Sequence, residues 1–235
     1  MTKVYSMDKR ALYNRSYDLR FELFFASQVA ILFGSLVVPL EFYERVLSPV
    51  LFLLNLVMGI LLISHKKGLT RLFLLMFGVS LAVFGIQLFV TPEEFGPENY
   101  VRLVVYFLFY IAVTIEIIKQ VWRTERVSKN VIMGLMSGYI SIGLLGFFLF
   151  LSIELMDPGA FNGLLLNEAN AAAKVDSLIY YSYITLLTIG YGEIYPVTPV
   201  AQKAAILVGL IGQFYLVIIT AVVVEKYIRH SQQKP

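Results

Sequence analysis

Residues 176–193 read DSLIYYSYITLLTIGYGE, and this stretch decides the fold. Its apolar segment, Ser177–Leu187, is too short to cross a bilayer as a helix at about 1.5 Å rise per residue. Asp176 precedes that segment as the expected helix N-cap. Two glycines then allow backbone conformations that other residues avoid. The pattern predicts a short re-entrant helix followed by an extended segment, Thr188–Gly192, with successive carbonyl oxygens turned to one side.

The composition places this stretch in a membrane protein. Of 235 residues, 58% are hydrophobic and 15% are charged, whereas soluble domains are about a quarter charged. A net charge of +3 without a basic patch argues against a nucleic-acid partner. The chain has no cysteine, which excludes disulfides and thiolate chemistry. The two histidines, His65 and His230, lie near expected membrane edges and are interpreted as interfacial residues, not metal ligands.

Six apolar runs predict membrane-spanning helices, each about 20 residues long where complete. The predicted class is an all-α membrane protein with a re-entrant pore helix between the fifth and sixth spans. The runs are Phe21–Leu40, Pro49–Ser64, Leu69–Val90, Tyr100–Val121, Val131–Ile153 and Val200–Val224.

The basic residues predict the orientation. Most of the 19 Lys and Arg residues fall in the N-terminal arm, in the loops around Lys66 and Arg123, and in the tail after Tyr227. Because Lys and Arg accumulate in cytoplasmic loops, both termini are expected in the cytoplasm. An even number of spans agrees, and the chain is expected to be a multi-pass protein of the plasma membrane.

The motif resembles the signature of the potassium channel family, usually written T-V-G-Y-G, with Ile189 in place of valine. Thr185 fits the pore-helix threonine of that family, and Tyr195–Pro199 fits the segment after the filter. Gly212 stands where many members have a glycine in the inner helix. The resemblance covers about Val131 to Tyr227 and is to a prokaryotic-type subunit with six transmembrane helices.

The resemblance implies a tetrameric pore in which backbone oxygens replace the hydration shell of K⁺. The filter residues would be Thr188, Ile189, Gly190, Tyr191 and Gly192, with K⁺ bound at the first four. One filter copy per chain implies a homotetramer in the lipid bilayer. K⁺ is then the permeant ion, and no catalytic cofactor and no nucleic acid is expected.

The sequence departs from the family pattern behind the filter. Glu193 follows the last filter glycine where aspartate is usual, and Ile184 replaces an acid or valine of the pore helix. The tryptophan pair of many members becomes Tyr180-Tyr181. Filter support is therefore assigned to Thr185, Tyr180, Tyr181 and Glu193.

The last span is expected to line the cavity. Gly212 is interpreted either as a hinge or as a close-packing position against the fifth helix, and the sequence leaves both open. Gln213 and Thr220 are polar residues expected to face cavity water. Val217 and Val224 are expected to form an apolar constriction, with Ile228 beyond them.

The fourth span lacks the repeated arginines of a voltage sensor. No basic residue lies between Arg102 and Lys119, and Glu116 stands there instead. Because gating charges supply only about 2.3 kcal/mol each per 100 mV, a sensor without them cannot respond steeply. Glu116 is expected to pair with Lys119 or Arg123, with proton or cation sensing as the alternative.

These inferences divide the chain into four parts: an N-terminal arm at 1–20, a four-helix domain at 21–123, a pore domain at 131–228 and a tail at 229–235. The arm is either a surface-lying amphipathic helix or disordered. Two rival functions stay open, namely a weakly selective cation channel and a potassium transporter or membrane sensor with a channel-like loop. An enzyme is not expected, because neither a Ser/His/Asp set nor a phosphate-binding loop is present.

Overall fold

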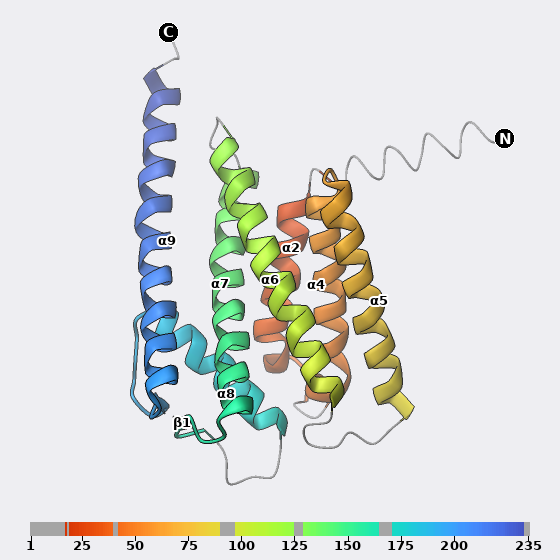
Figure 1. The fold of residues 1–235 in the computed structure, drawn as a ribbon. Helices are drawn as coiled ribbons and strands as arrows, with labels where there is room; N and C mark the ends of the chain where they lie inside the picture. The colour runs from red at the N-terminus through yellow and green to blue at the C-terminus, as the bar shows by residue number, and fades with distance from the viewer. Residues whose placement is uncertain are drawn as a thin grey trace, which may run out of the picture.

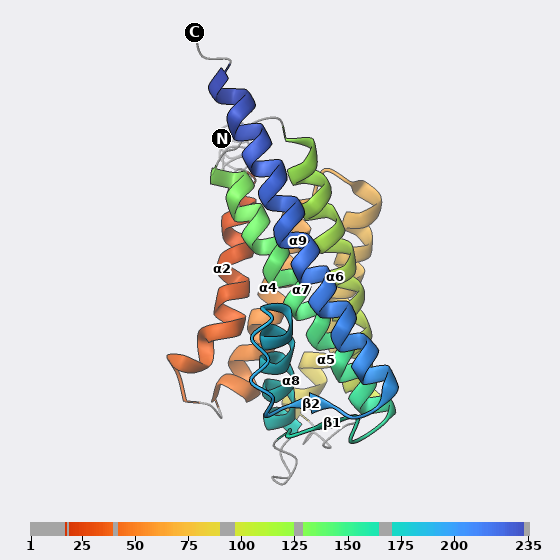
Figure 2. The same ribbon diagram turned by 90° about the vertical axis from the view of Figure 1, so that its left-hand side faces the viewer.

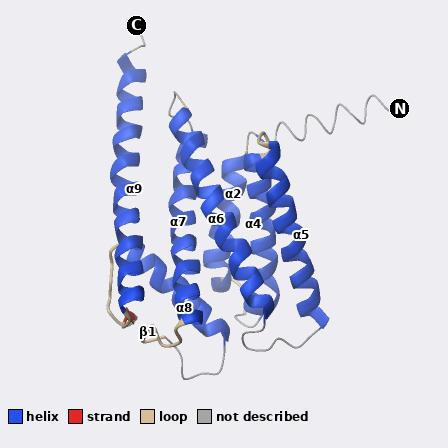
Figure 3. Ribbon diagram, viewed as in Figure 1, coloured by secondary structure: helices blue, strands red, loops and turns tan. Residues whose placement is uncertain are grey.

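The computed structural model describes residues 17, 19–39, 42–89, 97–124, 129–164 and 171–232. Most of the predicted N-terminal arm lies outside these residues. Helices dominate the described chain, and two short strands form its sheet (Figures 1 and 3). The elements are α2 (Arg20–Phe33), the 3-10 helix η1 (Gly34–Leu36), the π-helix η2 (Tyr43–Leu47), α4 (Ser48–Ile63), α5 (Lys67–Phe89), α6 (Pro97–Arg123), α7 (Lys129–Met156), β1 (Phe161–Asn162), α8 (Ala171–Leu186), β2 (Tyr195–Pro196) and α9 (Pro199–Gln232).

Four helices are long and apolar enough to cross a membrane. Their spanning segments are Lys67–Ile86, Tyr100–Arg123, Lys129–Met156 and Pro199–Glu225. The first two expected spans are shorter, since α2 has 14 residues and α4 has 16. The π-helix η2 runs directly into α4, so that helical backbone continues from Tyr43 to Ile63. A six-span topology stays a prediction.

Helix α7 is the centre of the arrangement. It packs against α2 and α6 on one side and against α8 and α9 on the other. Figure 1 shows α2, α4, α5 and α6 gathered beside α7, with α9 standing apart at the opposite edge. Figure 2, viewed from that edge, shows α9 crossing in front of α7, and α8 beside them at the end that carries β1 and β2. A four-helix half and a pore-like half therefore share one central helix.

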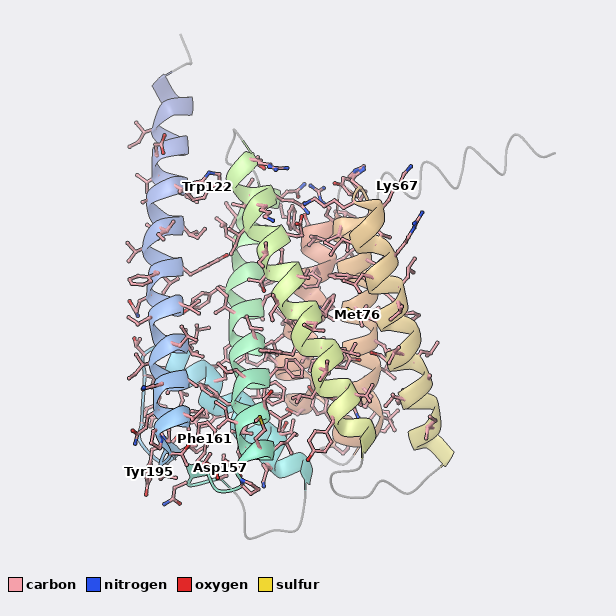
Figure 4. The ribbon with its side chains drawn as sticks, viewed as in Figure 1. Lys67, Met76, Trp122, Asp157, Phe161 and Tyr195 are labelled. Carbon is pink, nitrogen blue, oxygen red and sulfur yellow. The ribbon has the colours of Figure 1, made fainter. Side chains whose placement is uncertain are left out.

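The two ends of the molecule differ in chemistry. Lys67 and Trp122 lie at one end, and Asp157, Phe161 and Tyr195 lie at the other (Figure 4). The α4–α5 turn and the end of α6 meet at the first end, where the predicted cytoplasmic basic residues of these segments gather. The structure thus brings residues that are far apart in sequence to one end, and the orientation of that end in a membrane stays a prediction.

A buried polar cluster joins α2, α4, α6 and α7. The Asn55 amide donates to Ser27 Oγ at 2.8 Å and accepts from the Tyr110 hydroxyl at 2.8 Å. The Gln28 amide donates to Ser141 Oγ at 2.7 Å. Because water is absent from a bilayer core, polar side chains there bond to one another and hold helices together. This explains Asn55, a polar residue in an apolar span.

The predicted N-cap at Asp176 is wrong. Helix α8 begins at Ala171, so Asp176 lies within its second turn. Alanine has the highest helix propensity, and the run Ala171–Ala173 extends the helix backwards past the aspartate. The 16 residues of α8 span about 24 Å at the usual rise, which leaves the helix too short to cross a bilayer.

Candidate functional site

The segment Thr188–Gly192, which follows α8, has a backbone φ that is positive at every second residue, and we call it the alternating segment. Thr188 and Gly190 both have φ of 57°, and Gly192 has φ of 93°. Ile189 and Tyr191, which lie between them, are not in this left-handed region. A chain that alternates between the two hands turns its N–H groups to one side and its carbonyls to the other. The segment is thus not a regular strand, and the left-handed Thr188 is a feature that the sequence did not predict.

The first three N–H groups of this segment, those of Thr188, Ile189 and Gly190, bond back to α8. The Thr188 N–H donates to the Thr185 carbonyl at 3.1 Å, and the Ile189 and Gly190 N–H groups donate to the Ile184 carbonyl at 2.9 and 3.3 Å. These bonds satisfy carbonyls that the C-terminus of a helix leaves without partners. All five residues of Thr188–Gly192 are exposed in the single chain. An ion or other copies of the chain can therefore reach this segment.

The expected support residues behave differently from one another. The Tyr180 hydroxyl donates a short hydrogen bond to Glu193 Oε1, which bridges α8 and the exit of the segment. Tyr181 is buried and does not reach Glu193; its ring packs against Phe150 at 5.0 Å and Phe161 at 5.3 Å between centroids. Thr185 supplies a backbone carbonyl to the segment and a side-chain hydrogen bond to Tyr181.

The loop between α7 and α8 packs against Glu193, the residue that follows the alternating segment. A Cβ at Gly163 would lie 1.8 Å from the Glu193 carbonyl oxygen, so only glycine fits there. Strand β1 pairs antiparallel with β2, and the Val197 N–H donates to the Ala160 carbonyl at 2.9 Å. The segment is thus fixed at both ends, by α8 before it and by this loop after it.

Glu154 is a functional residue that sequence reasoning missed. Its buried carboxylate accepts from the Gly159 N–H at 3.0 Å and from the Phe161 N–H at 3.3 Å. The Lys174 ammonium of α8 lies 3.5 Å from the same carboxylate. One acid at the end of α7 therefore anchors both the loop and α8. No motif signals it, because its partners are backbone groups and a lysine 20 residues away.

Helix α9 presents the predicted cavity residues as one stripe. Thr198 Oγ1 caps its start by accepting from the Ala201 N–H at 3.3 Å, and Pro199 takes the first helical position. The predicted residues follow at spacings of four and three, which places them on one helical face. These exposed residues are Gln213, Val217, Thr220 and Val224.

The stripe begins at the inner end of the alternating segment. Gln213 Nε2 lies 3.4 Å from Thr188 Oγ1 and donates to it. Thr220 donates its hydroxyl to the Leu216 carbonyl at 2.7 Å, which satisfies the hydroxyl within its own helix. Val217 and Thr220 also line a shallow hollow on the exposed face of α9. Polar and apolar residues thus alternate along one face of α9, from Gln213 beside Thr188 to Val224.

Gly212 has a partner that the sequence did not indicate. A Cβ there would lie 2.7 Å from Leu186 Cδ1 and 2.8 Å from the Leu186 carbonyl oxygen. The packing interpretation expected a contact with the fifth helix, but the contact is with the last residue of α8. On α7, the corresponding row of glycines accommodates other side chains: Gly138 faces Tyr215 and Gly143 faces Tyr183.

Glu116 is a paired acid, as one of the two expectations had it. The buried carboxylate forms an ion pair with Lys66 at 2.5 Å, a partner that the sequence did not indicate. Lys119 lies at 3.9 Å, which confirms one of the two predicted partners. Among the described residues, Glu116 forms no ion pair with Arg123 and no group of three His, Cys, Asp or Glu residues has the geometry of a metal site.

Comparison with known proteins gives one match. Residues 159–229 match a protein-family model described as "Ion channel", a range that contains α8, the alternating segment and nearly all of α9. No curated protein and no solved structure matches the chain. The matched family argues for a non-enzymatic role. The match supports an ion channel, and together with the four apolar helices it indicates a multi-pass membrane protein.

Proposed function

We propose that four copies of this chain form a potassium-selective channel whose filter is the backbone of Thr188–Gly192. The observation that carries the proposal is the alternation of φ along this segment, with its N–H groups bonded to α8. Four such segments around an axis would stack rings of carbonyl oxygens at the spacing of single residues. Rings of this kind replace the water that K⁺ sheds.

The end of α8 adds an electrostatic contribution. The C-terminus of a helix carries a partial negative charge of about half an electron. Because α8 ends at Leu186, immediately before the filter, four such ends would point at the cavity below it. The Gln213 amide and the Thr188 hydroxyl lie at the same level and provide polar groups for a hydrated ion. K⁺ is therefore stabilised both before and within the filter.

The surface of α9 supports assembly. Only 17% of the most apolar stretch of α9 is buried within one chain, against 61% of the corresponding stretch of α7, although the stretch in α9 is the more hydrophobic of the two. A homotetramer would cover this face by placing four α9 helices around the axis. The cavity stripe would then face the pore, and Val217 and Val224 would form the apolar constriction toward the basic end.

The four-helix half is proposed to lack voltage sensing. Helix α6 carries no basic residue between Arg102 and Lys119, and its acid Glu116 is held by Lys66. We expect nearly voltage-independent opening in symmetric potassium, because no charge is available to move through the field. Steep activation over tens of millivolts in planar-bilayer recordings would contradict this.

We also propose that the protein lies in the plasma membrane with its basic end, and both termini, on the cytoplasmic side.

The test is ion flux through the purified protein in liposomes, with Gly190→Asp as the disabling variant. Within one chain a Cβ at Gly190 meets nothing within 4 Å, although its φ of 57° is one that side chains disfavour, and four aspartates there would put four charges into the proposed filter. Gly159→Asp is the matched control, since Gly159 is equally open and also has a positive φ, of 89°, but lies in the loop after α7. We expect K⁺ flux to vanish in the first variant and to persist in the second. Normal flux in Gly190→Asp would remove the filter assignment.

Reversal potentials decide between the proposal and its rivals. In mixed potassium and sodium, a selective channel reverses near the potassium equilibrium potential, whereas a weakly selective cation channel reverses near zero. Flux that saturates at low turnover would instead favour a transporter with a channel-like loop.

A further inference from the structure

A cavity lies at the basic end of the four-helix half, and none of its lining residues belongs to α8, the alternating segment or α9. It has a volume of about 250 Å³ and lies between the start of α2, the α4–α5 turn and the end of α6. This is below the range of roughly 300–1,000 Å³ of pockets for drug-sized ligands, and it suits a small head group better. Its lining residues are Tyr17, Arg20, Leu62, Ile63, His65, Lys66, Glu116, Gln120 and Arg123.

The charges around the cavity favour an anion. Three cations line it, Arg20, Lys66 and Arg123, against one carboxylate, Glu116. That carboxylate is already compensated by Lys66 and, from outside the lining, by Lys119. The C-termini of α4 and α6 oppose an anion with about half a charge each, and the N-terminus of α2 attracts one by a similar amount. After the side-chain and helix-end contributions are added together, the lining of the cavity keeps a net positive charge.

One of the three lining cations, Arg20, is held in position by several contacts. The Arg20 guanidinium donates to the Tyr17 carbonyl at 2.9 Å and to Gln120 Oε1 at 3.4 Å, and it stacks over the Tyr17 ring at 4.1 Å. Gln120 in turn donates to the Leu62 carbonyl at 3.1 Å. Arginine has five N–H donors in a planar fork that matches phosphate oxygens, and these contacts use two of them. Arg20 therefore loses little further side-chain entropy when a ligand binds.

The position of the cavity indicates where the ligand comes from. It is formed by helix ends, at the same end of the molecule as Lys67 and Trp122 (Figure 4). The spanning segments of α5 and α6 begin or end there, at Lys67 and Arg123, which is the level of the lipid head groups. Basic pockets between helices at this level bind anionic head groups.

We propose that this cavity binds a phosphate group, supplied by an anionic phospholipid of the adjoining leaflet or by a soluble phosphate compound. The ligand would bridge α2, the α4–α5 turn and α6. The inference is independent of the filter, because none of its residues lies in the pore half.

The test uses the purified full-length protein, with binding of phosphatidylglycerol, phosphatidylcholine and inorganic phosphate measured by native mass spectrometry. Arg123→Gln removes one exposed lining cation at the end of α6 and is not expected to disturb folding. Arg71→Gln is the matched control, since Arg71 is an exposed arginine at the start of α5 that does not line the cavity. We expect phosphatidylglycerol to bind about fivefold more weakly to Arg123→Gln than to the native chain or to Arg71→Gln.

Each outcome bears on the site. Saturable binding that depends on Arg123 supports it, and the identity of the probe that shows this dependence, lipid or inorganic phosphate, names the source. Equal weakening in both variants would reduce the effect to attraction by the whole basic surface and overturn the proposal. Equal affinity for phosphatidylglycerol and phosphatidylcholine, together with no saturable binding of inorganic phosphate, would also overturn it. Both variants should retain potassium flux, so that failure here is distinguishable from failure of the channel proposal.

Discussion

Replacing Gly212 by alanine tests whether this glycine is a packing position or a hinge. The new methyl group would lie 2.8 Å from the Leu186 carbonyl oxygen, a backbone atom that no change of side-chain rotamer can move. Helix α9 would have to shift away from α8, and overpacking of this kind costs about 1–3 kcal/mol. Gly209 is the matched control, because its Cβ would lie 3.9 Å from the Thr185 carbonyl, an ordinary contact.

Both substitutions gain about 1 kcal/mol of helix propensity, so their difference isolates the steric cost. We expect Gly209→Ala to be neutral or stabilising and Gly212→Ala to be less stable than Gly209→Ala by about 1–3 kcal/mol, or roughly 2–12 °C in Tm. The assay is thermal unfolding of the detergent-purified protein, followed by potassium flux in liposomes. Equal melting temperatures for the two variants would refute the packing argument. Loss of flux in Gly212→Ala but not in Gly209→Ala, at unchanged stability, would favour a hinge at Gly212.

Three further changes test the contacts around the filter. Glu154→Gln should destabilise the protein by about 1.5–3 kcal/mol, measured as a lower Tm, because two backbone N–H groups and an ammonium lose a charged acceptor. The hydrogen bond to Glu193 raises the pKa of Tyr180 to about 12, above the value of about 10 for a free phenol. Its stabilisation is therefore complete below pH 10 and is lost as the pH rises toward 12, and Tyr180→Phe should remove this loss from Tm profiles. Gln213→Leu removes the amide beside Thr188 and should lower single-channel conductance about two- to tenfold; unchanged conductance would place Gln213 outside the ion path.

Much of the pore half follows from local sequence. Positive φ at Gly190 and Gly192 is predictable, because glycine readily takes backbone conformations that other residues avoid. The short helix before it is predictable from an apolar run that cannot span a bilayer. Its start was misplaced because the capping preference of Asp176 competes with the helix propensity of the alanines before it, and the longer helix satisfies more backbone groups.

Residues that act over long sequence separations were not predictable. Lys66 and Glu116 are 50 positions apart, and periodicity carries no information about which loop lysine reaches a buried acid. Glu154 anchors backbone N–H groups, which every residue possesses, so no side-chain pattern marks it. Left-handed Thr188 follows from bonds that the segment makes with α8 and not from any preference of threonine.

The two halves of the chain are joined in a way that bears on the role of the four-helix half. Within one chain α7 packs directly against α2 and α6, and Lys129 at its start pairs with Glu22 at 3.1 Å. The Gln28–Ser141 hydrogen bond fixes the same interface in its apolar interior. Moving α2 relative to α7 would break these contacts together, and the row of regularly spaced basic residues that would let a membrane potential drive such a motion is missing from α6. In the proposed assembly the four-helix half would therefore act as a fixed support for α7, and other copies of the chain would cover the exposed face of α9.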